Sequence, residues 1–200
     1  MFIRNSKPIK LVGYRESSLT QEMLFLSHEA ADDVTIIEPQ EFRRSLYKDD
    51  FQYIVSFGLD LKERHDVCLE VDEYDIASYV HSTAYVADTA EIGDGTCIGP
   101  FSTVMQGASI GKHSILETYC LISHYTHLGN NCILHSGTML AGKSNIGNNV
   151  MFNFRSGATN KLEICDNTVV GAFSNVTKNI EKPGMYVGSP ARCIKTFDGV

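Results

Sequence analysis

The sequence lacks long hydrophobic runs. No stretch approaches the roughly 18 apolar residues that a membrane-spanning helix needs, so no membrane span is expected. The first residues, MFIRNSKPIKLVGYR, contain neither a long apolar core nor a cleavage site, and they do not predict a signal peptide. A net charge of −7 disfavours nucleic acid and anionic membranes as partners, although a few local cations can still hold an anionic ligand.

The cysteines lack the two-residue spacing of a zinc site. The chain has six of them, at Cys68, Cys97, Cys120, Cys132, Cys165 and Cys193. No metal is therefore expected. Scattered cysteines without a secretory signal are typical of reduced thiols, which predicts a cytoplasmic protein.

An unbroken six-residue repeat is the main feature that the sequence does have. Every sixth residue from Val86 is apolar: Val86, Ile92, Ile98, Val104, Ile110, Leu116, Ile122, Leu128, Leu134, Leu140, Ile146, Phe152, Ala158, Ile164, Val170 and Val176. Because only 43% of the residues are hydrophobic, such a run arises by chance roughly once in a million trials. A small residue usually stands two positions before the apolar one, and glycine often follows it directly.

This six-residue period predicts a coil of short strands. It excludes an α-helix, which repeats every 3.6 residues, and it suits flat strands joined by tight corners. The large aliphatic residue is expected to point inward, and glycine to relieve the corner. Three strands make a triangular coil of about 18 residues, so the run predicts about five coils. We assign this parallel β-helix and its C-terminal tail to residues 79–200.

Residues 1–78 follow a different pattern. Apolar runs at 9–12, 34–37 and 53–57 alternate with segments of helical character at 19–28, 40–47 and 60–70. Strands that alternate with helices predict a small parallel α/β, Rossmann-like domain. Residues 76–80 then lead into the coil.

The repeat resembles that of the hexapeptide acyltransferases, and the α/β segment ahead of it narrows the resemblance. The entry HSTAYVADTAEIGDGTCIG and the exit VTKNIEKPGMYVGSPAR are similar to those of nucleotide-sugar N-acetyltransferases and sialic acid O-acetyltransferases. The resemblance implies a left-handed β-helix, a homotrimer, and acetyl-CoA as co-substrate in the groove between subunits. It also implies small-molecule substrates bound by the N-terminal domain.

One loop departs from this family. After the first strand the family usually has a glycine cluster with a histidine, but this chain has GYRESS at residues 13–18. Fewer glycines leave less room for backbone amides to approach nucleotide phosphates. Gly13 and Gly58 are still the implied substrate-binding residues, with Arg15 and the serines as further donors. A free or lipid-linked sugar stays open beside a nucleotide sugar.

Acetyl transfer to an amine needs a base and donors for the developing oxyanion, and it needs no metal. His124, in LISHYTHLG, stands where the family has its catalytic histidine, so it is the predicted general base. The acidic residue that commonly follows in the family is Tyr125 here, and a hydroxyl does not stabilise an imidazolium as a carboxylate does. The stacking of successive coils is expected to place Gln106 beside His124.

Glu117 is the second predicted site residue, because the family often has a polar group there, near the substrate amine. It is expected to bind the incoming ammonium or to assist its deprotonation, with an ordinary exposed carboxylate as the alternative. We interpret His113, His127 and His135 as surface or stacking residues.

For acetyl-CoA, the resemblance implies contacts with the backbone of four residues: Ala141, Gly142, Gly171 and Ala172. The amide of Gly142, one coil after His124, is a candidate donor to the thioester oxygen. Three cations are candidates for the CoA phosphates, with a solvated surface as the alternative: Lys178, Arg192 and Lys195.

These features predict an acetyl-CoA-dependent enzyme that acetylates the amino group of a nucleotide-linked amino sugar for bacterial surface glycans. Two alternatives stay open: a sugar O-acetyltransferase of the sialic acid type, and a non-catalytic β-helix scaffold. A metal-dependent lyase on this fold would need three converging histidines. The equal intervals between His113, His124 and His135 are not multiples of the six-residue repeat, which places them at different corners of the coil and disfavours that reaction.

Overall fold

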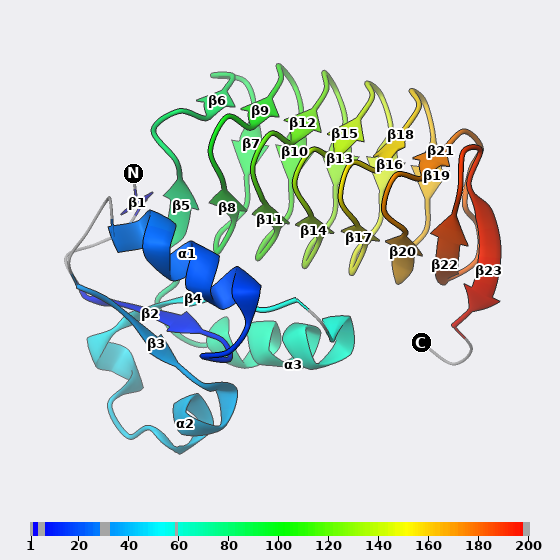
Figure 1. The fold of residues 1–200 in the computed structure, drawn as a ribbon. Coiled ribbons are helices and arrows are strands. Elements are labelled where there is room, and N and C mark those ends of the chain that lie inside the picture. The colour runs from blue at the N-terminus through cyan, green and yellow to red at the C-terminus, as the bar shows by residue number, and fades with distance from the viewer. Residues whose placement is uncertain (1, 4–6, 29–32, 59, 198–200) are drawn as a thin grey trace.

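The computed structural model describes residues 2–3, 7–28, 33–58 and 60–197. Its larger part is a left-handed parallel β-helix whose coils stack along one axis (Figure 1). Each strand pairs with the equivalent strand of the next coil, as Ile115 does with Ile133 and Ile133 with Met151. The predicted six-residue repeat and its three-sided coil are therefore confirmed.

Three sheets form the sides of the triangle. The first contains β1 (Phe2–Ile3), β5 (Ser78–Val80), β8 (Cys97–Ile98), β11 (Ile115–Leu116), β14 (Ile133–Leu134), β17 (Met151–Phe152), β20 (Thr168–Val170), β22 (Gly184–Val187) and β23 (Arg192–Thr196). The second contains β6 (Tyr85–Val86), β9 (Thr103–Val104), β12 (Leu121–Ile122), β15 (Met139–Leu140), β18 (Gly157–Ala158) and β21 (Asn175–Val176). The third contains β7 (Glu91–Ile92), β10 (Ser109–Ile110), β13 (His127–Leu128), β16 (Asn145–Ile146) and β19 (Glu163–Ile164).

The inward column of apolar residues forms the core of the coil. Side chains such as Ile122, Leu128 and Leu140 have no exposed surface. The small residues beside them add hydrogen bonds, since Ser114 Oγ donates to the carbonyl of Gly129 at 3.0 Å. The coil is longer than the repeat predicted, because β5 pairs with β8 at one end and β22 with β20 at the other.

The corners differ from the prediction in one respect. The residues with left-handed backbone stand three positions after the inward residue, as Tyr119 and Tyr125 do, with φ of 58° and 56°. The glycines one position after the inward residue have another cause. A Cβ at Gly111 or Gly129 would lie 2.6 Å or less from backbone atoms of the next coil. The close stacking of coils, rather than the turn, therefore requires glycine there.

The N-terminal part contains a three-stranded parallel sheet in the order β3-β2-β4. Its elements are β2 (Ile9–Val12), α1 (Ser18–His28), β3 (Val34–Ile37), α2 (Pro39–Arg44), a 3₁₀ turn (Lys48–Asp50), β4 (Gln52–Val55) and α3 (Leu61–Val71). The predicted alternation of strands and helices is confirmed in this short N-terminal α/β segment. The division of the chain at residues 78 and 79 stays a prediction.

The α/β part packs against the outer face of the first sheet of the coil (Figure 1). Ile115 and Ile133 point out of that sheet and join one buried cluster with Leu11 and Ile54. The buried guanidinium of Arg64, on α3, donates to the carbonyl of Val55 at 3.1 Å and to that of His113 at 2.7 Å. It also bonds to the side chain of Asn131. Leu19 and Met23 of α1 belong to the same buried cluster, so α1 and α3 are both fixed beside the coil.

None of the helices in the described ranges has the length and apolarity to cross a membrane.

Candidate active site

His124 stands at the corner that follows β12, and its side chain is exposed. Its ring lies over Gly142, because a Cβ added at Gly142 would come within 2.8 Å of Nε2 and 2.9 Å of Cε1. The two positions are aligned on successive coils, as the pairing of the strands before them shows. Glycine at this position leaves space for an imidazole that lies flat against the next coil.

The amide of Gly142 is available beside this imidazole. Within the described part of the chain, the N–H of Gly142 has no hydrogen-bond acceptor, while its carbonyl accepts from the N–H of Lys161 at 3.1 Å. The neighbouring N–H of Ala141 is instead donated to the carbonyl of Ala158 at 3.0 Å. Of these two neighbouring N–H groups, that of Gly142 is the one without an acceptor among the described residues, and its role as donor stays a prediction.

A groove of about 840 Å³ runs along the outer face of the second sheet. Met139 and Gly157 form part of its floor, and Gly157 deepens the groove because it has no side chain. One edge carries Ser123 and Ala141, the neighbours of His124 and Gly142. The other edge carries Ser136, together with residues of the corner after the first sheet. The predicted base therefore directly follows Ser123, a residue that lines this groove.

The rings of Tyr125 and His124 form an edge-to-face contact. The two ring centroids are 5.9 Å apart at an interplanar angle of 87°. The hydrogen-bond partner of the His124 ring is Ser123, whose Oγ lies 3.2 Å from Nδ1. Gln106 contacts the backbone of this corner, where its carbonyl accepts from the N–H of Tyr125 at 3.1 Å. No carboxylate in the described ranges is bonded to the ring of His124.

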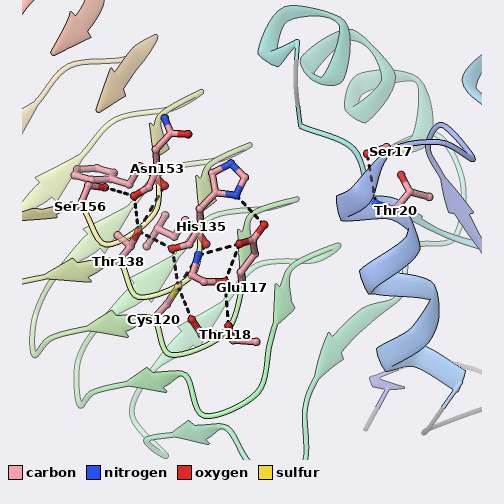
Figure 2. A network of polar contacts seen from close by, with 12 residues as sticks. Ser17, Thr20, Glu117, Thr118, Cys120, His135, Thr138, Asn153 and Ser156 are labelled. Carbon is pink, nitrogen blue, oxygen red and sulfur yellow. Dashed lines mark hydrogen bonds and ion pairs between the residues drawn. The ribbon is translucent and has the colours of Figure 1, made fainter. Parts of the chain in front are cut away.

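A carboxylate does support another histidine, and the sequence interpretation missed it. Figure 2 shows Glu117 bonded to His135, with Nδ1 2.7 Å from Glu117 Oε1. The other carboxylate oxygen accepts from the N–H of Ser136 at 2.9 Å and from its hydroxyl at 3.0 Å. Glu117 and His135 are 18 residues apart, so the stacking interval that suggested Gln106 for His124 would have identified this pair.

The Glu117 carboxylate is buried, with 7% of its surface exposed. Burial by itself raises its pKa, but the hydrogen bond and charge of His135 and the two bonds from Ser136 outweigh burial and hold the pKa below its ordinary value. Glu117 is therefore ionised at neutral pH. Glu22, on α1, lies near this pair: burial raises its pKa, and the charge of Glu117 raises it further.

In the loop at residues 13–18, two backbone N–H groups are engaged within the chain: that of Gly13, and that of Ser17, which is donated to the carbonyl of Tyr14 at 2.9 Å. The N–H of Gly13 is donated to the carbonyl of Ile37 at 3.0 Å, and Arg15 is paired with Glu41 at 3.0 Å. A Cβ at Gly13 would collide with the hydroxyls of Thr20 and Ser56. The adjoining hollow of about 420 Å³ is lined by three carboxylates and by aromatic and hydroxyl groups: Glu16, Asp60, Glu63, Tyr14, Phe57 and Ser17.

Gly58 packs against the coil. A Cβ there would lie 2.4 Å from the side chain of Ile133 and 3.2 Å from that of Leu19. Both Gly13 and Gly58 thus have packing reasons to be glycine, and their contact with a substrate stays a prediction.

The structure brings together two of the three predicted phosphate contacts. Lys178 and Arg192 line one hollow of about 260 Å³ at the C-terminal end of the coil. Lys195 lies on β23 and has its ammonium 6.0 Å from the ring of Phe197. The N–H of Gly171 is donated to the carbonyl of Tyr186 at 2.8 Å, while Ala172 is exposed beside it.

No group of three or more His, Cys, Asp or Glu side chains within the described residues is arranged to hold a metal ion. The other histidines have separate surroundings. His113 is buried against Asp72 at 3.2 Å, and His127 bonds to Ser109 at 2.7 Å on the third sheet.

The fold is shared with solved acetyltransferases. No protein-family model matches the chain, and no curated protein matches it in sequence. The acetyltransferase domain of PglB from Neisseria gonorrhoeae is similar with a TM-score of 0.86 and 16% identity, over 94% of this chain and 100% of that one. The same domain in complex with acetyl coenzyme A gives a TM-score of 0.85 and 15% identity, over 95% and 100%.

A third similar structure is a histidine-to-asparagine mutant of perosamine N-acetyltransferase from Caulobacter crescentus, in complex with CoA and GDP-perosamine. It has a TM-score of 0.81 and 16% identity, and the match covers 95% of this chain and 98% of that one. At this identity the comparisons show a common fold along nearly the whole chain.

Proposed function

We propose that this protein transfers an acetyl group from acetyl-CoA to the amino group of a nucleotide-linked amino sugar, in the synthesis of bacterial surface glycans. The observation that carries the proposal is the contact between His124 and Gly142, a base and an unengaged backbone N–H next to two residues that line a long groove, Ser123 and Ala141. The shared fold supports it, because the similar PglB domain was solved with acetyl coenzyme A and perosamine N-acetyltransferase with CoA and GDP-perosamine.

In the proposed reaction the acceptor nitrogen bonds to the carbonyl carbon of the thioester, and the bond from that carbon to sulfur breaks. His124 accepts a proton from the nitrogen and passes it to the departing sulfur, so CoA leaves as a thiol. The N–H of Gly142 donates to the carbonyl oxygen while negative charge develops there. Ser123 holds the imidazole of His124 through Nδ1, which leaves Nε2 for the acceptor.

The remaining predicted contacts complete this proposal. Ala141, Gly171 and Ala172 would follow the CoA chain, and the cations Lys178, Arg192 and Lys195 would meet its phosphates. We assign acceptor binding to the Rossmann-like part at residues 1–78, including Gly13 and Gly58, with Glu117 near the acceptor amine. The transferase domain is residues 79–200, in a cytoplasmic homotrimer whose sites lie between subunits.

The direct test is turnover of His124→Ala with acetyl-CoA and a panel of acceptors. The panel contains amino sugars in free and nucleotide-linked forms, and matched sugars with a hydroxyl at the same position. We expect transfer to the amine and a loss of about 10²–10⁴ in kcat for the variant. Near-normal turnover of His124→Ala contradicts His124 as the base. Transfer only to hydroxyls supports an O-acetyltransferase, and absence of acetyl-CoA binding in calorimetry supports a scaffold.

A further inference from the structure

The hydrogen bonds of Glu117 leave its carboxylate little capacity for a substrate. An ionised carboxylate has about four acceptor positions. Three donors already occupy most of them: Nδ1 of His135 at 2.7 Å, and the N–H and hydroxyl of Ser136 at 2.9 and 3.0 Å. The hydroxyl of Thr118 in turn donates to Ser136 Oγ at 3.0 Å, so the donors are themselves held in place. Glu117 therefore acts on its surroundings through His135.

The ionised carboxylate also fixes the form of the His135 ring. A carboxylate only accepts, so the ring nitrogen that faces it, Nδ1, must carry the hydrogen. In the neutral imidazole the lone pair is then on Nε2. Among the described residues, Nε2 of His135 has no hydrogen-bond partner. The ring is stacked on Phe154 with centroids 4.9 Å apart, which limits its rotation.

The surroundings of His135 favour a cation. Its side chain keeps 18% of its surface exposed, so a ligand can reach it. Glu22 of α1 adds a second carboxylate near the pair, and Figure 2 shows α1 facing this side of the coil. A phosphate would be repelled here, whereas an ammonium group gains from both carboxylates. Ser136 also lines the rim of the groove opposite Ser123, which connects this position with the groove of the proposed reaction.

We propose that His135, oriented by Glu117, is a second base that removes the first proton from the acceptor's ammonium group. This rests on the proposed function. An amino sugar is delivered mainly as R–NH₃⁺, which has no lone pair for attack. Nε2 of His135 takes one proton, the acceptor becomes R–NH₂, and the proton passes from the ring to solvent. His124 then takes the second proton as the nitrogen bonds to the acetyl carbon.

These separate roles explain why the two histidines differ in their ring partners and in their positions on the coil. Among the described residues, the ring of His124 has a serine and no carboxylate as its partner, and His124 stands at the corner after the second sheet. His135 has the carboxylate and stands at the corner after the first sheet, beside α1. Glu117 is a positioning residue in this scheme, and His135 is the catalytic residue that touches the acceptor.

The test compares the pH dependence of kcat/KM for wild type and His135→Gln with an amino-sugar acceptor. We expect His135→Gln to lose about 10–100-fold near neutral pH. The loss should shrink toward wild type as the pH rises to the pKa of the ammonium group, because the acceptor then arrives as free amine. KM for acetyl-CoA should not change. The matched control is His127→Gln, on the third sheet, which should follow wild type at every pH.

A loss that is equal at all pH values, or no loss at all, overturns the role of His135. Glu117→Gln provides a second variant in case His135→Gln unfolds, because its amide keeps the shape of the carboxylate but no longer fixes the ring as an ion does. Glu117→Gln should lose less kcat/KM than His135→Gln near neutral pH, and this loss should also shrink as the pH rises. If wild type acetylates no amine, the proposed function fails instead, so the two failures are distinguishable.

Discussion

The imidazole of His124 and the backbone of Gly142 are in contact across two successive coils, with room for a hydrogen but not for a methyl group. Gly142→Ala would place its Cβ 2.8 Å from Nε2 of His124 and 2.9 Å from Cε1. We expect the ring to be displaced and kcat to fall by about tenfold or more, since a misplaced base loses rate steeply. Steady-state kinetics with circular dichroism as the check on folding will measure this.

The control for that substitution is the same change in the background of His124→Ala. With the ring absent, Gly142→Ala has no clash to cause, so its further effect on kcat and on stability should be small. An equal loss in both backgrounds would show that Gly142 acts independently of His124.

Lys178 and Arg192 line one hollow, and this predicts where the charged end of acetyl-CoA binds. Lys178→Gln and Arg192→Gln should each raise KM for acetyl-CoA by about tenfold, because each removes a charge-assisted contact with phosphate. kcat should change little. Isothermal titration with CoA and with dephospho-CoA separates the 3′-phosphate from the diphosphate. Lys195→Gln is the comparison, and a larger effect there than at Lys178 would move the phosphates onto β23.

The Glu117 carboxylate predicts a specific dependence of stability on pH. Its pKa in the folded protein is held below the ordinary value of 4.5. It therefore contributes stability above that value, and the contribution is lost as the pH falls through the folded pKa. Urea unfolding between about pH 3 and about pH 8 should show Glu117→Gln less stable than wild type near neutrality, with the gap closing in acid. A constant gap would contradict this account.

Glu163→Gln is the matched control for that measurement. Its carboxylate is exposed and bonds to Asn145 at 2.9 Å across the same interval of one coil. An exposed pair of this kind contributes little, so its pH curve should follow that of wild type.

His124 and His135 stand at different corners of the coil, which allows a test of whether a site combines two subunits. We expect equal amounts of His124→Ala and His135→Gln, unfolded and refolded together, to recover about a quarter of wild-type activity at neutral pH. In a random trimer about one junction in four pairs an intact His124 with an intact His135. Each variant refolded alone is the control. Absence of recovery in trimers that are shown to be mixed would place both histidines in a site within one subunit.

The coil could be predicted because its signal is local and repeated. One inward residue in six defines the strands, and the length of one coil then aligns Gly142 with His124. The same interval aligns Glu117 with His135, a pair that neither residue indicates by its own position in the sequence. The corner glycines were misinterpreted, since the close approach of Gly111 to the next coil depends on stacking and not on the turn.

The contacts between the α/β part and the coil could not be predicted from the sequence. Gly58 is small because Ile133 lies against it, and these residues are far apart in the chain. The hydrogen bonds of Arg64 to Val55, His113 and Asn131 join separate segments of the chain. No sequence pattern at these residues predicts the contacts. Packing between distant segments determines such positions, so they require the three-dimensional arrangement.

The constant coil length spaces equivalent positions of the β-helix evenly along its axis. His124, Gly142 and Lys178 share one column, since the strands before them are in register through β12, β15, β18 and β21. Neighbouring strands are about 4.8 Å apart, so Lys178 stands about 14 Å along the axis from His124. In the proposed reaction, this column sets the distance between the acetyl group and the CoA phosphates in steps of one coil. We therefore expect that a carrier with a shorter or longer arm would require one complete coil to be removed or added.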